Sequence, residues 1–382
     1  MARSLTIEIV PEVLKWLRTT AGWETEDVGR RLGTSPETVK DLESGKKKPS
    51  LTQLRVLSKI YKRPLASFFL SKPKEEKPMP KDYRFLPTKT DIFDRKTVLA
   101  IRRSRGLQSI GRELSLNIRY ETSTKLKMAM LTDNPEIIAA EYRELFTLNL
   151  DKQRQFKDAY KMFGFLRDVL EDLNVLVFQF PMPVEDARGF ALADEIPNII
   201  VINSRDSIEA RLFTMMHEFG HIILGETVID IPEESLLIRN NIEMWCNEFS
   251  SSFLLPEKIA NELFNKYMRS LTDTATLNSL SKKYKVSKAL LLVKMVNLNY
   301  ITEQDFNSVL ARYILKETKQ EKEKKKAISV ASDQRCLSEM GNKFVSIVAN
   351  NFDREFITYN DALSYLSIKS KNFDRVLARA RK

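Results

Sequence analysis

The feature that most constrains this chain is the pentad His217-Glu218-Phe219-Gly220-His221. Its two histidines are the only ones among 382 residues, and they lie four positions apart with a glutamate directly after the first. Residues i and i+4 share one face of an α-helix, so both imidazoles can reach a single cation. The H-E-x-x-H pattern is typical of a zinc-binding helix. Because the flanking residues are mostly apolar, we expect this helix to be buried.

The chemistry of zinc assigns a role to each member of the pentad. Zn²⁺ accepts neutral imidazole nitrogens, and a catalytic zinc has three protein ligands and a water. Glu218 projects about 100° around the helix from His217, where it could act as the general base on that water. The alternative is structural, with two core histidines that bond only to backbone groups.

A third metal ligand cannot be a histidine, because none remains. The next helical stretch offers Glu243 and Glu248, which project about 140° apart, so only one of them should face the metal. Asn247 lies one turn after Glu243 and could hold a ligand histidine through a hydrogen bond. Either glutamate could instead be a solvated helix carboxylate.

The residues around these positions resemble the ImmA/IrrE family of metallopeptidases. The resemblance is carried by Ala210-Arg211-Leu212-Phe213-Thr214 before the pentad, and by Glu243-x-x-Cys246-Asn247-x-Phe249-Ser250 and Leu254-Leu255-Pro256 after it. It implies a thermolysin-like zinc endopeptidase with one Zn²⁺ per chain. It also implies Glu218 as the catalytic base, and His217, His221 and Glu243 as the metal ligands. Phe219, Cys246, the serines after Phe249 and Gly225 depart from the family pattern, but none of them removes a ligand.

The N-terminal residues predict four short helices. Apolar residues recur at helical spacing in 11–21, followed by helices at 25–32, from Pro36 with Ser35 as N-cap, and at 51–61. A glycine turn at 33–34 joins the second and third helices, as in a helix-turn-helix unit. This stretch is similar to the Cro/XRE class of regulators. The predicted contacts to double-stranded DNA are Ser35, Thr38, Lys40, Lys46, Lys47 and Lys48.

Two acidic residues oppose this DNA-binding interpretation. Glu37 and Asp41 lie near the groove-facing side of the third helix, where a carboxylate repels phosphate although it can accept a hydrogen bond from cytosine. The alternative is a domain of the same fold that docks a protein or serves only as structure.

The net charge of +11 lies at the two ends of the chain. Residues 1–80 hold 16 basic and 10 acidic residues, and residues 301–382 hold 16 and 11, whereas the middle is neutral. Any nucleic-acid contact is therefore expected at the ends. The two cysteines do not indicate a disulfide framework, and Cys246 is expected to be a small buried residue. With no long apolar run and no signal-peptide core, we expect a cytoplasmic protein without a membrane partner.

The pattern along the chain predicts a mainly α protein of the α+β class. Its predicted parts are a helix-turn-helix domain (1–72), a linker (73–90), a helical scaffold (91–174), a zinc metallopeptidase core (175–300) and a helical C-terminal region with a charged linker (301–382). Two strands, 175–180 and 199–203, are expected to form a small sheet, with prolines and Arg188-Gly189-Phe190 separating them. Its edge could pair with an extended peptide, or it could be covered.

Two functional hypotheses follow. The first is a zinc endopeptidase fused to a DNA-binding domain. The resemblance implies that such an enzyme cleaves a repressor or antitoxin-like partner to control transcription. A homodimer is compatible with this hypothesis. The second is a non-proteolytic regulator or antitoxin whose zinc domain senses or binds a partner. Only the first requires Glu218 as a base.

Overall fold

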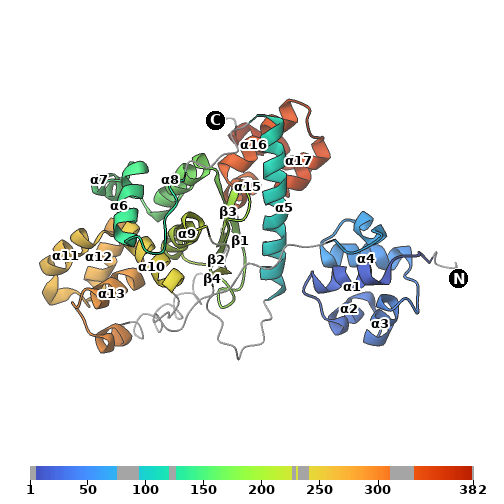
Figure 1. The fold of residues 1–382 in the computed structure, drawn as a ribbon, viewed down its shortest axis with the longest axis horizontal. Coiled ribbons are helices and arrows are strands. Elements are labelled where there is room, and N and C mark those ends of the chain that lie inside the picture. The colour runs from blue at the N-terminus through green and yellow to red at the C-terminus, as the bar shows by residue number, and fades with distance from the viewer. Residues whose placement is uncertain are drawn as a thin grey trace. The chain divides into compact units, whose positions relative to one another are not determined.

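The computed structural model describes residues 6–74, 94–119, 126–225, 229–230, 241–309 and 331–380, without the side chains of 229, 230 and 380. The chain forms two compact units (Figure 1). The first contains the described residues 6–74 and 94–103, and the second contains those from 104 onward. The predicted linker, from residue 75 on, and the charged run 316–326 lie outside the described residues.

The N-terminal unit is built from short capped helices. They are α1 (Pro11–Thr19), α2 (Thr25–Leu32), α3 (Pro36–Glu43), α4 (Leu51–Tyr61) and the 3₁₀ turn η1 (Leu65–Phe69). The Ser35 hydroxyl accepts a hydrogen bond from Thr38 N at the start of α3, and Ser50 forms a capping box with Gln53 at the start of α4. Gly33 takes the left-handed conformation, with φ of 67°, at the turn between α2 and α3. These local signals explain why α2, α3 and α4 occur where the sequence predicts them.

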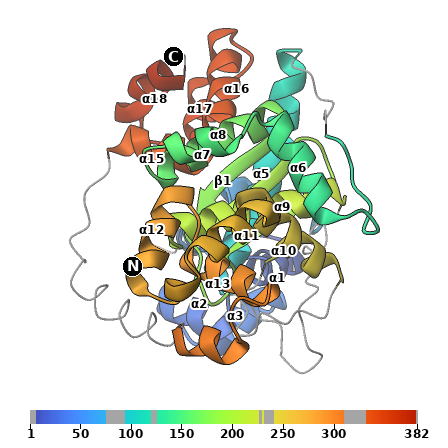
Figure 2. The same cartoon turned by 90° about the vertical axis from the view of Figure 1, so that its left-hand side faces the viewer.

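The second unit is mostly helical. Its helices are α5 (Arg95–Asn117, from residue 104 on), α6 (Pro135–Leu145), α7 (Leu150–Gln155), α8 (Ala159–Asp172), α9 (Ile208–Ile223), α10 (Asn241–Leu254), α11 (Glu257–Lys266), η2 (Met268–Ser270), α12 (Thr274–Tyr284), α13 (Lys288–Asn297), α15 (Ser332–Met340), α16 (Asn342–Asp353), α17 (Tyr359–Leu366), η3 (Ser370–Asn372) and α18 (Phe373–Ala380). In Figure 2 the C-terminal helices lie beside α8, and α11–α13 lie next to α9 and α10. No helix in the described ranges combines the length and apolarity that a membrane span requires.

A small mixed sheet forms the centre of this unit. Its strands are β1 (Val175–Phe180), β2 (Gly189–Leu192), β3 (Asn198–Asn203) and the two-residue β4 (Ile229–Asp230), in the order β1-β3-β2-β4. β1 and β3 pair in parallel, whereas β2 is antiparallel to both β3 and β4. The sequence prediction was wrong in treating Arg188-Gly189-Phe190 as a separator, because β2 begins at Gly189. A short segment that starts with glycine has little strand signal of its own, and its pairing with β3 is a tertiary effect.

Both faces of the sheet are covered. Val175 and Val177 pack into the main core with α8, α9 and α10, while Leu176 points the other way and approaches Gly111 of α5. Phe178 packs edge-on against Phe344 of α16 with the ring centroids 5.5 Å apart. Burial on both faces explains the unbroken apolar run in β1, since an exposed face would show alternation. The predicted mainly α, α+β fold class is confirmed.

Candidate metal centre

Helix α9 carries the histidine pentad through the core. Ser207 caps it by accepting a hydrogen bond from Ala210 N, and Glu209 in the first turn suits the helix dipole. From Thr214 to Ile223 every residue is buried. The pentad therefore lies on a helix enclosed by packing, as the apolar flanks predict.

Gly220 lets the second helix of the centre approach α9. A Cβ at this position would lie 3.1 Å from Cys246 Sγ and 3.4 Å from Cys246 Cα, closer than side chains normally pack. Cys246 itself is fully buried, as predicted, and forms no disulfide. Because α10 can lie directly against the glycine, Glu243, one turn before Cys246, reaches the histidines.

Three donor groups converge between α9 and α10. His217 Nε2 lies 3.2 Å from Glu243 Oε2, His221 Nε2 lies 3.2 Å from Glu243 Oε1, and the two Nε2 atoms are 3.1 Å apart. All three side chains are at most 1% exposed. The group could hold a metal ion, since each residue offers one ligand atom within mutual reach.

The carboxylate of Glu243 is kept ionised inside the protein. Burial alone would raise its pKa, but hydrogen bonds and charge attraction from His217 and His221 outweigh burial and hold the pKa of Glu243 well below its usual range. An anionic oxygen beside two imidazoles is a donor set that suits zinc.

Glu218 lies outside this group of three and faces the sheet. It is fully buried, and its Oε1 lies 3.3 Å from where a Cβ on Gly189 of β2 would stand. The same Cβ would lie 2.5 Å from Thr214 Cγ2 and 2.8 Å from the Val201 carbonyl oxygen. The first residue of β2 must therefore be glycine for the strand to pack this closely on α9 beside Glu218.

Glu248 belongs to a different set of contacts. Its carboxylate accepts a hydrogen bond from the Ser252 hydroxyl at 3.2 Å. It also lies near Lys294. Burial lowers the pKa of Lys294, and attraction from Glu248 and two other glutamates offsets this only in part. The structure thus brings Glu243, and not Glu248, to the histidine nitrogens. Asn247 is half-buried, and its hydrogen bond to a histidine stays a prediction.

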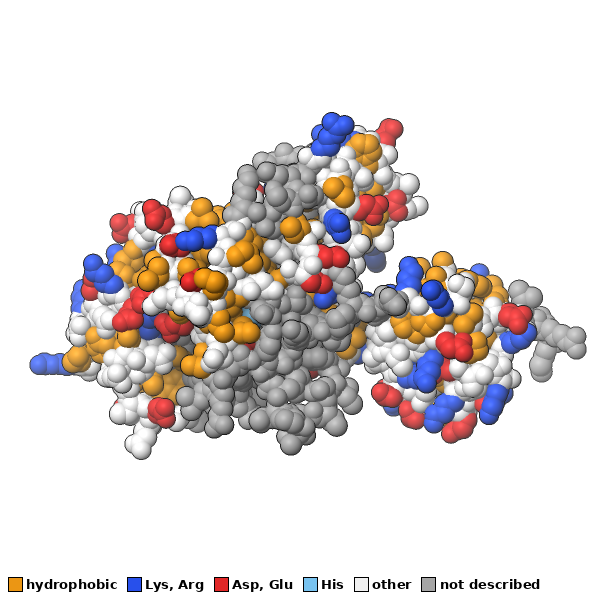
Figure 3. Space-filling view, viewed as in Figure 1, with side chains coloured by type: hydrophobic (Ala, Val, Ile, Leu, Met, Phe, Trp, Pro, Cys, Tyr) orange, Lys and Arg blue, Asp and Glu red, His pale blue; other side chains and the backbone are white. Residues whose placement is uncertain are grey.

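The predicted DNA contacts lie at the surface of the N-terminal unit. Lys40 is exposed on α3, and Ser35 is also exposed although its hydroxyl caps that helix. Lys46, Lys47 and Lys48 are all exposed, but Lys47 Nζ lies 2.9 Å from Asp41 Oδ2 and Lys48 Nζ lies 3.3 Å from Glu8 Oε1. Lys47 is the main cause of the lowered pKa of Asp41. In Figure 3 basic and acidic side chains are mixed over the visible face of this unit.

One charged pair of the N-terminal unit was not predicted. Arg18 of α1 donates from Nε and Nη2 to the two carboxylate oxygens of Glu43, at 2.7 and 3.0 Å, and from Nη1 to the Trp23 carbonyl. The pair is mostly buried and joins the first helix to the end of α3. Glu43 is therefore a structural residue, and no local sequence pattern marks its partner 25 positions away.

Comparison with known proteins finds matches to two regions of the chain. Residues 170–295 match the family model described as the IrrE N-terminal-like domain, and residues 12–67 match a helix-turn-helix domain. The chain is 33% identical over 75 residues to the radiation response metalloprotease IrrE of Deinococcus radiodurans. That stretch covers 18% of this chain and 23% of the relative.

The chain therefore carries an IrrE N-terminal-like domain and a helix-turn-helix domain on one polypeptide, and the resemblance drawn from the motif residues is confirmed. The buried histidines and Glu243 lie inside the first of these matched regions, and the lysine-bearing turn after α3 lies inside the second.

Proposed function

We propose that the protein is a zinc-dependent endopeptidase joined to a DNA-binding domain. The observation that carries the proposal is the buried convergence of His217, His221 and Glu243, with Glu218 on the same helix. The IrrE N-terminal-like domain and the name of the relative, a metalloprotease, support it.

The donor atoms fit zinc in kind and in spacing. Zinc–nitrogen and zinc–oxygen bonds of about 2.0 to 2.1 Å in a tetrahedral site place neighbouring donors about 3.3 Å apart. The donor distances of 3.1 and 3.2 Å are close to that edge length. Three protein ligands leave one position for water or substrate, as in catalytic zinc sites.

The residues around the site then have distinct roles. Zinc bound there would supply a Lewis acid that polarises the scissile carbonyl and promotes ionisation of water. Glu218 accepts a proton from the attacking water and returns it to the leaving amine. The helices that bury this glutamate keep bulk solvent away from the proton transfer.

The sheet offers a place for the substrate backbone. β2 pairs along its whole length with β3, whereas in the described part of the chain β4 pairs only with Gly189 and Phe190. An extended peptide could pair with Ala191 and Leu192, the part of β2 that does not pair with β4 in the described residues, and these residues continue the strand whose Gly189 lies beside Glu218.

We further propose that the substrate is a repressor or antitoxin-like protein and that cleavage controls transcription. The helix-turn-helix domain supports this idea, because it would bring the peptidase to proteins bound at the same DNA. Dimerisation on a two-fold DNA site would strengthen such binding.

The test is cleavage of the product of a neighbouring gene by the zinc-loaded full chain. We expect cleavage by the wild type and a loss of about 10²- to 10⁴-fold in Glu218→Gln, which cannot take the proton. Glu248→Gln is the matched control and should cleave normally. If Glu218→Gln cleaves at the wild-type rate, the proposed chemistry is wrong. Binding without cleavage by the wild type would favour a non-proteolytic regulator.

A further inference from the structure

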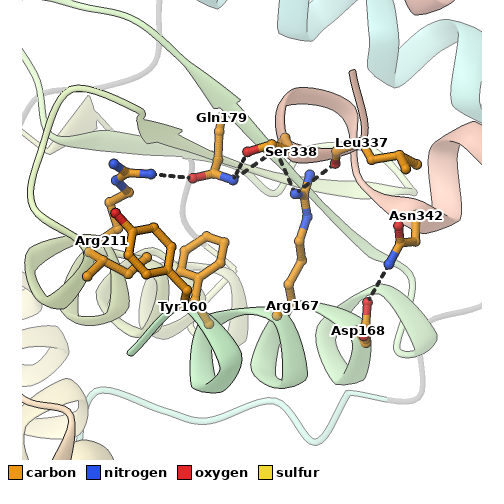
Figure 4. Close-up of a pocket in the computed structure, with 11 residues that line it drawn as sticks. Tyr160, Arg167, Asp168, Gln179, Arg211, Leu337, Ser338 and Asn342 are labelled. Carbon is orange, nitrogen blue, oxygen red and sulfur yellow. Dashed lines mark hydrogen bonds between the residues drawn. The ribbon is translucent and has the colours of Figure 1, made fainter. Parts of the chain in front are cut away.

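The second unit contains a cavity of about 200 Å³ that is separate from the metal centre (Figure 4). It lies where α8 and β1 meet the start of α9 and the C-terminal helices α15 and α16. Tyr160, Phe163 and Ile208 give it an apolar side, and Gln179, Arg211 and Ser338 give it a polar side. The carboxylate of Asp168 also lines the cavity, and it accepts a hydrogen bond from Asn342. A cavity that combines an apolar wall with polar groups can orient a small molecule that has one apolar and one polar end.

Arg211 is the arginine of the cavity whose guanidinium group can still bind an anion. Its Nε donates to the Asp206 carbonyl oxygen at 2.8 Å and its Nη1 to Gln179 Oε1 at 3.1 Å, both uncharged acceptors. The Asp206 carboxylate is bonded to Arg188 instead. Burial lowers the pKa of Arg211, against the attraction of nearby Tyr160, Asp206 and Glu209. No described residue bonds to its Nη2, so this edge of the guanidinium can receive an anion.

Arg167, the second arginine of the cavity, is already fully engaged. It donates to the Glu171 carboxylate and to the carbonyl oxygens of Val177, Leu337 and Ser338. Glu171 in turn accepts from Lys343 N at the start of α16. Arg167 therefore joins α15 to α8 and β1, and Figure 4 shows its bonds to Leu337 and Ser338.

Gly164 keeps part of the cavity open. It lies within α8, where glycine is unfavourable relative to alanine. A Cβ at this position would meet no heavy atom within 4 Å, so packing against the protein does not explain the glycine. Since Gly164 lines the cavity, a side chain there would occupy the space beside Tyr160 and Phe163.

We propose that this cavity binds a small organic anion, a carboxylate attached to a flat apolar group. The carboxylate would accept a hydrogen bond from Arg211 Nη2, and the apolar group would lie beside Tyr160, Phe163 and Gly164. Drug-sized ligands occupy pockets of roughly 300 to 1,000 Å³, so this smaller cavity suits a ligand of about ten heavy atoms. Such a ligand would contact α9, which also carries the histidines, and the C-terminal helices together.

The probe is 4-fluorobenzoate, with binding to the full chain followed by ¹⁹F NMR. For so small a ligand we expect a dissociation constant on the order of 1 mM. Benzamidine, which has a similar shape and a positive charge, should not compete. Inorganic phosphate, which lacks the apolar part, should bind at least about tenfold more weakly. Equal binding of either comparison compound would overturn the proposal.

Two variants and a matched control test the location. Arg211→Gln should weaken binding at least about tenfold through loss of the charged hydrogen bond, and Gly164→Met should abolish it by filling the cavity. Gly106→Met is the control, because Gly106 of α5 is an exposed helical glycine whose added Cβ also meets nothing within 4 Å. It should bind like the wild type. If Arg211→Gln does not fold, Gly164→Met still decides, and wild-type binding by that variant would overturn the proposal.

Discussion

Charged and polar side chains are arranged in opposite ways at the metal centre and on the helix-turn-helix surface. On α9 and α10 they are buried and converge on one point, although His221 and Glu243 are 22 positions apart in sequence. On α3 and the turn after it they lie at the surface and form separate ion pairs, Lys47 with Asp41 and Lys48 with Glu8. A buried polar cluster must be compensated, which makes it informative about chemistry, whereas exposed pairs contribute little energy and leave function open.

The largest expected effect is the loss of metal from His217→Ala. The wild-type chain should hold about one zinc, and removal of one of three protein ligands should leave almost none after gel filtration. Metal analysis by mass spectrometry measures this directly. A variant that keeps full zinc would show that the buried cluster is a structural hydrogen-bond group, and the contrast between the two regions would disappear.

Glu243 and Glu248 provide the next test, because they lie on one helix in different surroundings. Glu243→Gln should weaken zinc binding severely, since the amide loses the charge that faces both histidines. Glu248→Gln removes a carboxylate that contacts Ser252 and should retain zinc. Zinc affinity by chelator competition measures both. The reverse result would transfer the ligand role to Glu248.

How far the sequence predicts each region depends on whether the signal is local. The start of α3 was predictable because Ser35 caps it and Pro36 opens it. The spacing of His217 and His221 likewise requires only one helix. The Arg18–Glu43 pair was missed because its members lie 25 positions apart. The strand β2 was missed although β3 follows it closely, because a four-residue segment that starts with glycine has little strand signal of its own. Glu243 is intermediate: helix geometry left two candidates, and the resemblance favoured the one that the structure brings to the histidines.

Gly189→Ala tests the packing that holds β2 beside Glu218. The added Cβ would lie 2.5 Å from Thr214 Cγ2 and 2.8 Å from a backbone oxygen of β3, so the strand must shift. We expect the free energy of unfolding to fall by about 1 to 3 kcal/mol, as for overpacked cores. Urea denaturation of the metal-loaded chain measures it.

Gly106→Ala is the control for this variant. It also adds a methyl group to a glycine, but in an exposed helix with no heavy atom within 4 Å of the new Cβ. It should stabilise the chain by roughly 0.5 to 1 kcal/mol through helix propensity. Equal effects of the two substitutions would show that the close approach of β2 to α9 carries no energetic cost.

The smallest expected effects are on the turn after α3, where Lys47 and Lys48 form ion pairs and Lys46 forms none with the described residues. Each lysine that neutralises a phosphate contributes about 0.9 to the slope of log K against log salt. Lys46 is available for this, and Lys46→Gln should flatten the slope by about one unit. Lys47 is already bonded to Asp41, so Lys47→Gln should change the slope less while it leaves an uncompensated carboxylate that weakens binding at every salt concentration. Asp41→Asn should do the opposite and tighten binding at low salt, because it removes a repulsive charge and frees Lys47.

Fluorescence anisotropy of a labelled duplex across a salt series, with the full chain, measures all three variants. Equal slopes for Lys46→Gln and Lys47→Gln would show that the ion pair breaks on binding, and absence of binding by the wild type even at low salt would make this unit a docking module for protein.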